Sequence, residues 1–458
     1  MRRWLVWNAV FRLQEGLKGH PTYRILREME TADRLSPWEM EELRAEKLRK
    51  LVEYCYAHVP FVRMRMRERG LEPSDIREPK DLGRLPIMTK EDVRARRADL
   101  RSEVAGKLRY FSTSGSTGSP LTVDLSKQRI ASHVACRQRV GRWWGVSVGD
   151  PEVALWGPPL VPSYRDHLRT MRDRLMATRL LSAYEMDDAT MSGYLDILES
   201  RRWRQMFGYP SAIYLLCRHA AKQGRALRNS GIKVVFVTGE VLFPHQRELI
   251  SETLGCKVAN GYGGRDSGFV AHECPHGGLH VMADTSIVEI VDSDGQPVPP
   301  GEPGEIVVTD LYSKEAPFLR YATGDIGVSS GRACPCGRPL PLLDRLEGRA
   351  LDVVYAPDGR KIPGLALNPV LWKVDGIEQI RVYQKRVDCF HVQVVRNEQY
   401  QAACEERIRS GWSEILRAPL DVTFEYLPKL SSEPSGKSRF IISEVRRERD
   451  LRETTAII

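Results

Sequence analysis

A run of small hydroxyl and glycine residues within residues 110–122, Y-F-S-T-S-G-S-T-G-S-P-L-T, constrains the fold more than any other stretch. Its polar core suits neither a helix nor a strand interior and consists of Ser112, Thr113, Ser114, Gly115, Ser116, Thr117 and Gly118. The two glycines permit positive φ, so the backbone N–H groups can converge into a nest that attracts an anion. Apolar residues bracket the run on both sides. We therefore expect a loop held between strands, with a flexible Ser/Gly linker as the alternative.

The length and composition indicate a globular protein of two or three domains. The chain has 458 residues, of which 42% are hydrophobic and 28% charged. No apolar run reaches the roughly 18 residues that a membrane span needs. The N-terminus, M-R-R-W-L-V-W-N-A-V-F, is expected to form a folded helix, with an amphipathic surface anchor as the alternative. The net charge of +9 suits small polyanions, and aromatic residues do not interleave with the basic runs, so no nucleic acid partner is expected.

Nine cysteines without a signal peptide pattern predict reduced thiols and a cytoplasmic location. Most of them are isolated among apolar neighbours, whereas Cys334 and Cys336 form a C-P-C pair. Cys274 is followed by two histidines, His276 and His280. Three thiols and one imidazole predict a closed, structural zinc site, with unliganded cysteines as the alternative.

Hydrophobic periodicity divides the chain into a helical start, an α/β middle and a smaller α+β end. Residues 1–105 read as helical, with a helix over 38–56 after Ser36-Pro37, a turn at 59–63 and another helix after Thr89. The middle alternates strands at 153–156, 234–237 and 258–260 with helices at 129–144 and 210–222. Alternating apolar residues at 286–291 and 305–309 predict an antiparallel β subdomain. Beyond residue 350, strands are expected at 353–355, 380–383, 390–395 and 422–426, with a helix over 398–416.

Two strand ends in the middle region finish in small and polar residues. The first is T-G-E, which contains Gly239 and Glu240. The second is N-G-Y-G-G-R-D-S-G, in which Tyr262 could stack on a purine and an acidic side chain could hold Mg²⁺ or a hydroxyl; a glycine-rich hairpin is the alternative. Further on, Asp325 in R-Y-A-T-G-D is expected on a tight glycine turn that suits two vicinal hydroxyls.

These motifs, in this order, resemble the adenylate-forming superfamily of acyl-CoA synthetases, luciferases and peptide-synthetase adenylation domains. The Ser/Thr/Gly run resembles its phosphate loop; the P-loop of nucleotide hydrolases is excluded because no lysine follows Gly118. The tyrosine segment resembles Y-G-x-T-E, with Arg265 in place of threonine and Asp266 in place of glutamate. R-Y-A-T-G-D matches the ribose signature, G-R-A-L-D resembles the hinge motif, and Lys437 lies on a loop like that of the catalytic lysine. The arginine and the helical start point to the phenylacetate–CoA ligase-like branch and its CapK-like relatives.

The resemblance implies an α/β fold with a large N-terminal domain, residues 1–349, that includes a β subdomain, and a small mobile α+β domain, residues 350–458. It implies ATP, Mg²⁺ and coenzyme A as cofactors, and His280 as the histidine of the zinc site. Lys437, Asp266 and Arg265 would be catalytic. The residues expected to bind nucleotide are those of the 112–118 loop together with Gly239, Glu240, Tyr262, Gly263, Asp325 and Arg349.

The expected activity is AMP-forming ligation of a carboxylic acid to a thiol, with coenzyme A as the expected acceptor. Aromatic residues at Trp156, Phe207 and Tyr209 favour an aryl acid, although core packing explains them equally well. The alternatives are a ligase with an amine, hydroxyl or carrier-protein acceptor, an inactive zinc-containing scaffold, and a basic nucleic-acid binder. Dimers occur in the resembling family, but no sequence pattern here indicates a homodimer.

Overall fold

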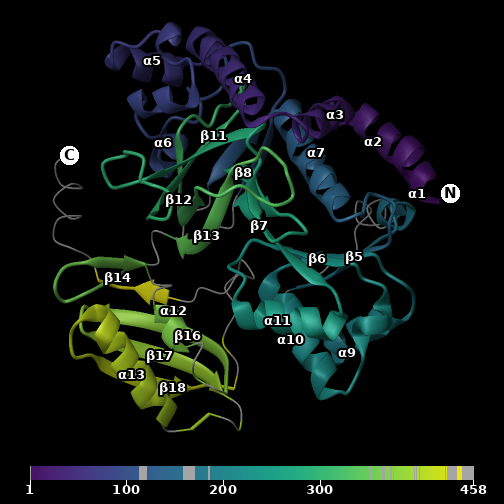
Figure 1. Ribbon diagram of the computed structural model, residues 1–458, viewed down its shortest axis with the longest axis vertical. Helices are drawn as coiled ribbons and strands as arrows, with labels where there is room; N and C mark the ends of the chain where they lie inside the picture. The colour runs from purple at the N-terminus through teal and green to yellow at the C-terminus, as the bar shows by residue number, and fades with distance from the viewer. Residues whose placement is uncertain are drawn as a thin grey trace. The chain divides into compact units, whose positions relative to one another are not determined.

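The computed structural model describes residues 2–112, 121–157, 171–183, 186–349, 353–363, 367–371, 374, 376–396, 398, 400–401, 403–428, 430 and 441–445. It separates into two units (Figure 1). The first comprises Met1–Thr323 and Gly327–Leu346, and the second comprises Gly324–Ile326 and Glu347–Ile458. Among the described residues, none of the helices has the length and apolar character required to cross a bilayer. The expected boundary between residues 349 and 350 stays a proposal, because residues 350–352 lie outside the described residues.

The first unit begins with a layer of helices, two of which begin at capping residues that the sequence reveals. Its elements are α1 (Arg2–Leu5), the π-helix η1 (Val6–Phe11), α2 (Arg12–Lys18), α3 (Thr22–Ala32), α4 (Pro37–His58), α5 (Pro60–Glu68), the 3₁₀ turns η2 (Pro73–Asp75) and η3 (Pro79–Arg84), and α6 (Lys90–Ala95). Ser36 forms a capping box with Glu39, and Thr89 forms one with Asp92, so both predicted helix starts are confirmed. The turn predicted at residues 59–63 is wrong, because Pro60 is the first residue of α5, a position where the missing N–H costs nothing.

An 11-stranded sheet forms the body of the first unit, in the order β10-β11-β12-β13-β9-β8-β7-β6-β5-β3-β4. Its strands are β3 (Glu152–Leu155), β4 (Thr178–Leu181), β5 (Gln205–Gly208), β6 (Val234–Thr238), β7 (Lys257–Gly264), β8 (Gly268–Glu273), β9 (Leu279–Val281), β10 (Ser286–Val291), β11 (Pro303–Asp310), β12 (Tyr321–Ser330) and β13 (Leu342–Arg349). The pairs from β4 to β7 are parallel, whereas β7–β8, β8–β9 and β10–β11 are antiparallel. The strands of the predicted β subdomain are therefore antiparallel, as expected, but they continue the same sheet.

Helices cover this sheet as the alternating pattern predicts. They are α7 (Lys127–Trp143), α9 (Asp188–Glu199), α10 (Pro210–Lys222) and α11 (Pro244–Leu254). The parallel strands are rich in β-branched residues and buried, as in Val234–Thr238, where four of the five residues are buried. One core joins these strands to α9, α10 and α11, and another joins the sheet to α3, α4 and α7. The predicted α/β fold class is confirmed.

The second unit is a small α+β domain with its own core. It contains β14 (Val353–Tyr355), β15 (Lys361–Pro363), α12 (Asn368–Leu371), β16 (Ile377–Arg386), β17 (Cys389–Arg396), α13 (Ala403–Leu416), β18 (Asp421–Tyr426) and β19 (Ile441–Ser443). Four strands pair in the order β18-β17-β16-β19. Trp412 of α13 is fully buried against Phe390 of β17, and its indole N–H donates to the Leu367 carbonyl at 3.1 Å.

Candidate active site

The Ser/Thr/Gly run lies between two paired strands. β1 (Arg109–Ser112) and β2 (Thr122–Leu125) are antiparallel, and Ser112 lies opposite Thr122. The predicted bracketing of the run by strands is thus confirmed. Residues 113–120, which include Thr113, Ser114, Gly115, Ser116, Thr117 and Gly118, lie outside the described residues.

Tyr262 lies on a strand within a tight hairpin. The prediction that the strand ends near residue 260 is wrong, because β7 continues to Gly264 and pairs with β8. Gly263 permits this pairing, since a Cβ there would be 2.2 Å from the Gly268 carbonyl oxygen. The Tyr262 hydroxyl donates to Thr323 Oγ1 at 3.2 Å. Thr323 belongs to R-Y-A-T-G-D, so the hairpin and that segment are hydrogen-bonded to each other.

Asp266 lies in the turn of the same hairpin and is held from two directions. The Tyr321 hydroxyl donates to Asp266 Oδ2 at 2.8 Å. Arg129 of α7 donates to the backbone carbonyl of Asp266. Tyr321 immediately precedes Ala322-Thr323, so R-Y-A-T-G-D contacts the hairpin at both Tyr262 and Asp266. The neighbouring Arg265 has an exposed side chain.

The arginine that holds this turn is itself buried and paired. The Arg129 side chain is fully buried, and its Nε donates to Asp310 Oδ2 at 2.7 Å. Its guanidinium also lies 4.4 Å from the centre of the Phe318 ring. Burial alone would raise the pKa of Asp310, but the Arg129 charge, His133 and the Tyr312 N–H lower it overall. Asp310 is therefore ionised, and the pair fixes the end of β11 to α7.

The remaining expected nucleotide contacts, Asp325 and Arg349, both belong to the second unit. Asp325 lies within strand β12 and not on the predicted tight turn, although Gly324 before it has φ of 77°, a conformation that glycine adopts without strain. Arg349 is the last residue of β13. Residues 350–352 of the hinge motif and Lys437 lie outside the described residues. Their roles stay predictions.

An aromatic cluster lies at the end of the parallel strands, beside the T-G-E segment. The Trp156 and Tyr209 rings stack with centroids 4.0 Å apart, and Phe207 lies 5.1 Å from Trp156. Gly239 has φ of 85° and faces the Tyr209 ring, where a Cβ would be 3.1 Å from Cε1. Glu240 Oε2 accepts from the Ser211 backbone N–H at 3.2 Å, at the start of α10. The segment therefore combines an aromatic wall with a carboxylate at a helix start.

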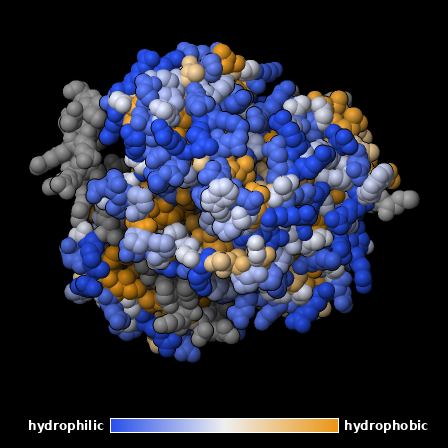
Figure 2. All heavy atoms as spheres, turned by 45° about the horizontal axis from the view of Figure 1, so that its top comes forward, coloured by the Kyte–Doolittle hydropathy of each residue, from blue (hydrophilic) through white to orange (hydrophobic). Residues whose placement is uncertain are grey.

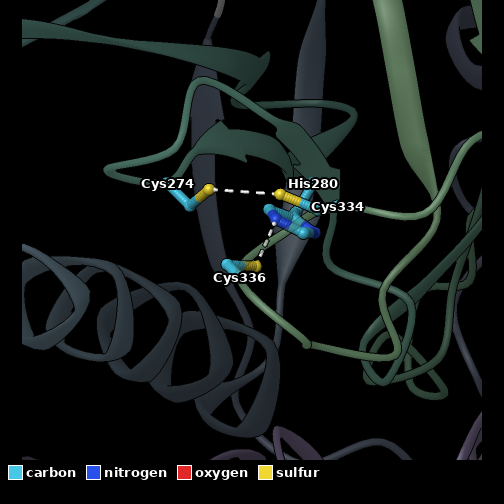
Figure 3. A group of neighbouring side chains, drawn as sticks. All are labelled: Cys274, His280, Cys334 and Cys336. Atoms are coloured by element: carbon cyan, nitrogen blue, oxygen red, sulfur yellow. Dashed lines mark hydrogen bonds between the residues drawn. The ribbon is translucent and has the colours of Figure 1, made fainter.

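The predicted metal ligands come together, as Figure 3 shows. One ligand atom from each of Cys274, His280, Cys334 and Cys336 lies within 4.8 Å of all the others. Cys274 Sγ is 3.6 Å from Cys334 Sγ, and Cys336 Sγ is 3.2 Å from His280 Nε2. Two thiolates bound tetrahedrally to one zinc ion would be roughly 3.8 Å apart. The donor set therefore fits a closed zinc site and selects His280 over His276.

The surroundings of His280 suit metal binding. Its Nδ1 lies 3.2 Å from the Leu340 carbonyl, so Nε2 faces the sulfur atoms. Burial lowers the pKa of His280 to about 4, which keeps the imidazole neutral near pH 7. Trp143 packs edge-on against the ring at 5.7 Å, and its indole N–H donates to Asp33 at 2.8 Å.

Comparison with protein families agrees with this arrangement. Residues 109–311 match the family described as AMP-binding enzyme, and residues 354–444 match the CapK C-terminal domain. The chain belongs to the adenylate-forming superfamily. Within it, the chain falls in the branch of phenylacetate–CoA ligases and their CapK relatives.

Named relatives place this member of the superfamily more closely. A phenylacetate–coenzyme A ligase of Thermus thermophilus is 29% identical over 69% of this chain and 72% of its own length. Protein CapK of Staphylococcus aureus is 21% identical over 89% of this chain and 90% of its own length. A 2-hydroxyisobutyryl-CoA ligase solved in the postadenylation state has a TM-score of 0.73 at 20% identity, covering 93% of this chain and 94% of that one. This last likeness shows the shared fold.

Two residues of this adenylate-forming chain were missed as site residues in the sequence. Arg129 is one of four arginines on α7, and nothing in its immediate neighbours distinguishes it from the others. Tyr321 lies inside R-Y-A-T-G-D, but only the aspartate was given a role. Tyr321 is fully buried, and a buried tyrosine hydroxyl requires a hydrogen-bond partner. A tyrosine inside an apolar strand was therefore the sequence signal that could have pointed to this residue.

Proposed function

We propose that this protein activates a carboxylic acid with ATP, releases pyrophosphate, and transfers the acyl group from the acyl adenylate to a thiol, with coenzyme A as acceptor and AMP as the second product. The observation that carries the proposal is the pair of hydrogen bonds from R-Y-A-T-G-D to the hairpin, Tyr262 to Thr323 and Tyr321 to Asp266. They bring two motifs that lie 55 or more residues apart in sequence into one group. The family matches and the named relatives support the same reaction.

Each motif has a proposed part in adenylation. A carboxylate is a poor acyl donor because its oxygen cannot leave, whereas AMP can, and such phosphoryl chemistry depends on positioning and charge neutralisation. The 112–118 loop would cradle the β- and γ-phosphates. Tyr262 would stack on adenine, with Gly263 allowing close approach, and Asp325 would accept hydrogen bonds from the ribose. Asp266, held by Tyr321, would orient Mg²⁺.

The other proposed residues act at the edges of this group. Arg265 would contact phosphate from the hairpin turn, and Gly239 with Glu240 would line the nucleotide side of the sheet. Arg349 would support the nucleotide. Lys437 would pair with the acyl carboxylate and the α-phosphate during adenylation and leave before the thiol enters, through rotation of the second unit.

We propose an aryl acid as substrate. Trp156 and Phe207 are partly exposed and present ring surface at the end of the parallel strands, where ligands of α/β sheets bind. Two relatives named phenylacetate–coenzyme A ligase support this class. An amine, hydroxyl or carrier-protein thiol is the alternative acceptor class.

We also propose that Cys274, His280, Cys334 and Cys336 hold zinc. The ion would occupy all four positions with protein ligands, so it would stabilise the fold without taking part in the reaction.

Product analysis tests the function. The protein is incubated with ATP, Mg²⁺ and a panel of aryl acids, with and without coenzyme A, and AMP, ADP and acyl conjugates are measured. We expect AMP only when an acid is present, and roughly a 10²–10³-fold slower adenylation in Lys437→Ala. Lys385→Ala is the matched control, since Lys385 is an exposed lysine of the same unit paired with Glu444. ADP formation, or ATP binding without turnover, would refute the ligase. An adenylate that accumulates regardless of coenzyme A would point to the alternative acceptor class.

A further inference from the structure

The N-terminal helical segment presents two chemically different faces. α1, η1 and α2 form the arm that leads to the N-terminus (Figure 1). On the inner face, Val6 and Phe11 are buried and pack with Met176. The same cluster includes partly buried Trp7 and Val10. The inner face therefore anchors the arm to the first unit.

The outer face is an apolar stripe that the unit does not cover. Leu5, Ala9, Leu13 and Leu17 recur every four residues, and all are exposed. Leu13 and Leu17 are 65% and 81% exposed, and Trp4 at the end of the stripe is 66% exposed. We call these five residues the N-terminal stripe. Figure 2 shows hydrophobic side chains gathered at this end of the molecule. A stripe of this length on one helical face is the pattern of a surface that meets another apolar phase.

The segment that packs beside the arm also exposes apolar side chains. Met176 is in the inner-face cluster, and just before it Met171 and Leu175 are 57% and 53% exposed. A hollow of about 440 Å³ opens next to the helix and is lined by Arg3, Trp4, Trp7, Asn8, Arg142 and Ser147. Aromatic rings and guanidinium groups thus lie side by side at the edge of the stripe.

The charge around the stripe is mainly positive, and part of it is paired, as Arg3 is with Asp150 and Arg24 with Glu28. Residues 1–27 contain one acidic residue, Glu15, and these basic residues: Arg2, Arg3, Arg12, Lys18, Arg24 and Arg27. Glu15 is buried and accepts from Lys18 and Thr22, so its charge and that of Lys18 offset each other, and the positive excess comes from the other basic residues. A second copy of the chain pressed against this stripe would bring like charges together. An anionic surface would not.

We infer that the N-terminal stripe docks the protein on an anionic phospholipid membrane. The arm would lie in the plane of the interface, with Leu13 and Leu17 among the acyl chains, Trp4 at headgroup level, and Arg3 and Arg12 near lipid phosphates. This binding is independent of the proposed ligase reaction. It would place the enzyme at a lipid surface through an arm that lies on the bilayer and does not cross it.

Vesicle co-sedimentation of the full chain tests the inference. We expect binding to phosphatidylcholine vesicles that contain phosphatidylglycerol, little binding to phosphatidylcholine alone, and weaker binding as salt is raised. The double variant Leu13→Gln/Leu17→Gln should bind about a hundredfold less, because each leucine contributes about a factor of ten. Val104→Gln is the matched control, since Val104 is also an exposed apolar residue, at 60%, and should leave binding unchanged.

Three results would overturn the inference. These are the absence of binding to the anionic vesicles, an equal loss in the Val104 variant, and binding that ignores lipid charge. Light scattering of the same samples tests the other possible occupant of the stripe, a second copy of the chain. A dimer that the Leu13/Leu17 variant converts to monomer, without vesicle binding by the original chain, would assign the stripe to a second copy. Circular dichroism and thermal unfolding of the double variant should match those of the original chain, because both leucines are exposed.

Discussion

The buried pair Arg129–Asp310 gives the sharpest prediction about how the hairpin is held. Arg129→Met keeps a long apolar side chain in place but removes the charge opposite Asp310. The carboxylate then stays buried, at 4% exposure, and its remaining neighbours are the Tyr312 N–H and the His133 ring, whose Nε2 lies 3.7 Å from Asp310 Oδ2. Removing one partner of a buried ion pair costs about 3–5 kcal/mol, because the other charge is left uncompensated. We expect a loss of this size in the free energy of unfolding.

A second substitution should recover much of the loss. In Arg129→Met/Asp310→Asn the buried group is neutral, and the amide oxygen can still accept from the Tyr312 N–H. The double variant should therefore regain at least about half of the lost stability, which is a coupling that independent sites would not show. Arg137→Met is the matched control on the same helix. Its side chain is 50% exposed and pairs with Glu152, so its removal should cost less than about 1 kcal/mol.

The pH dependence of the two proteins should differ in sign. In the original chain the pKa of Asp310 is lowered, so the pair's contribution is fully present above the unfolded carboxyl pKa and is lost as the pH falls through the folded value. In Arg129→Met, burial without the arginine raises that pKa instead. Protonation on acidification then relieves the buried charge. The stability difference between the original chain and Arg129→Met should therefore shrink as the pH falls from neutral.

Urea unfolding followed by tryptophan fluorescence measures these differences. Seven of the nine tryptophans precede residue 350, so the signal reports mainly on the first unit. A loss below about 1 kcal/mol in Arg129→Met, or a double variant no more stable than the single one, would refute the reasoning. So would a stability difference that stays constant with pH.

Three further outcomes are expected. Cys336→Ser should lower bound zinc, measured by mass spectrometry, from about one per chain to a small fraction and reduce the thermal midpoint, because a tetrahedral site needs all four ligands; unchanged zinc content would contradict the site. Tyr321→Phe should raise the Mg²⁺ concentration for half-maximal AMP formation about tenfold, since it deletes a hydrogen bond to the Asp266 carboxylate but keeps the ring; a change in thermal midpoint alone would assign Tyr321 to folding only. Trp412→Ala should cost the second unit about 3–5 kcal/mol in urea unfolding, through a cavity beside Phe390; a cost under about 1 kcal/mol would be inconsistent with its burial.

Local chemistry made many elements predictable from the sequence. The helix after Ser36-Pro37 and the helix 210–222 were predicted because caps, prolines and apolar spacing act over a few residues. The strands at 286–291 and 353–355 have the predicted bounds for the same reason. The turn expected at 59–63 failed because proline both ends and begins helices, and only packing decides which.

The sequence predicted the motif residues of the site but not the residues that hold them in place. The four metal ligands and Tyr262 stand in motifs whose residue types indicate their chemistry. Arg129 does not, because its partner Asp310 is 181 residues away and other arginines on α7 look the same in sequence. Burial and pairing are tertiary properties, and they distinguish Arg129 from the exposed Arg137. His280 was favoured over His276 by resemblance, and the geometry selected it on distance.

The placement of the metal ligands has a consequence for the unfolded chain. Cys274 and Cys334 are 60 residues apart, and β10, β11 and β12 all lie between them. An ion shared by both ends would close this whole stretch into a loop. On a loop-closure estimate, a cross-link of that span disfavours the unfolded ensemble by about 4 kcal/mol. Zinc would thus act as a reversible cross-link between reduced thiols. It would disfavour the unfolded chain in the way that a disulfide does in an oxidising compartment.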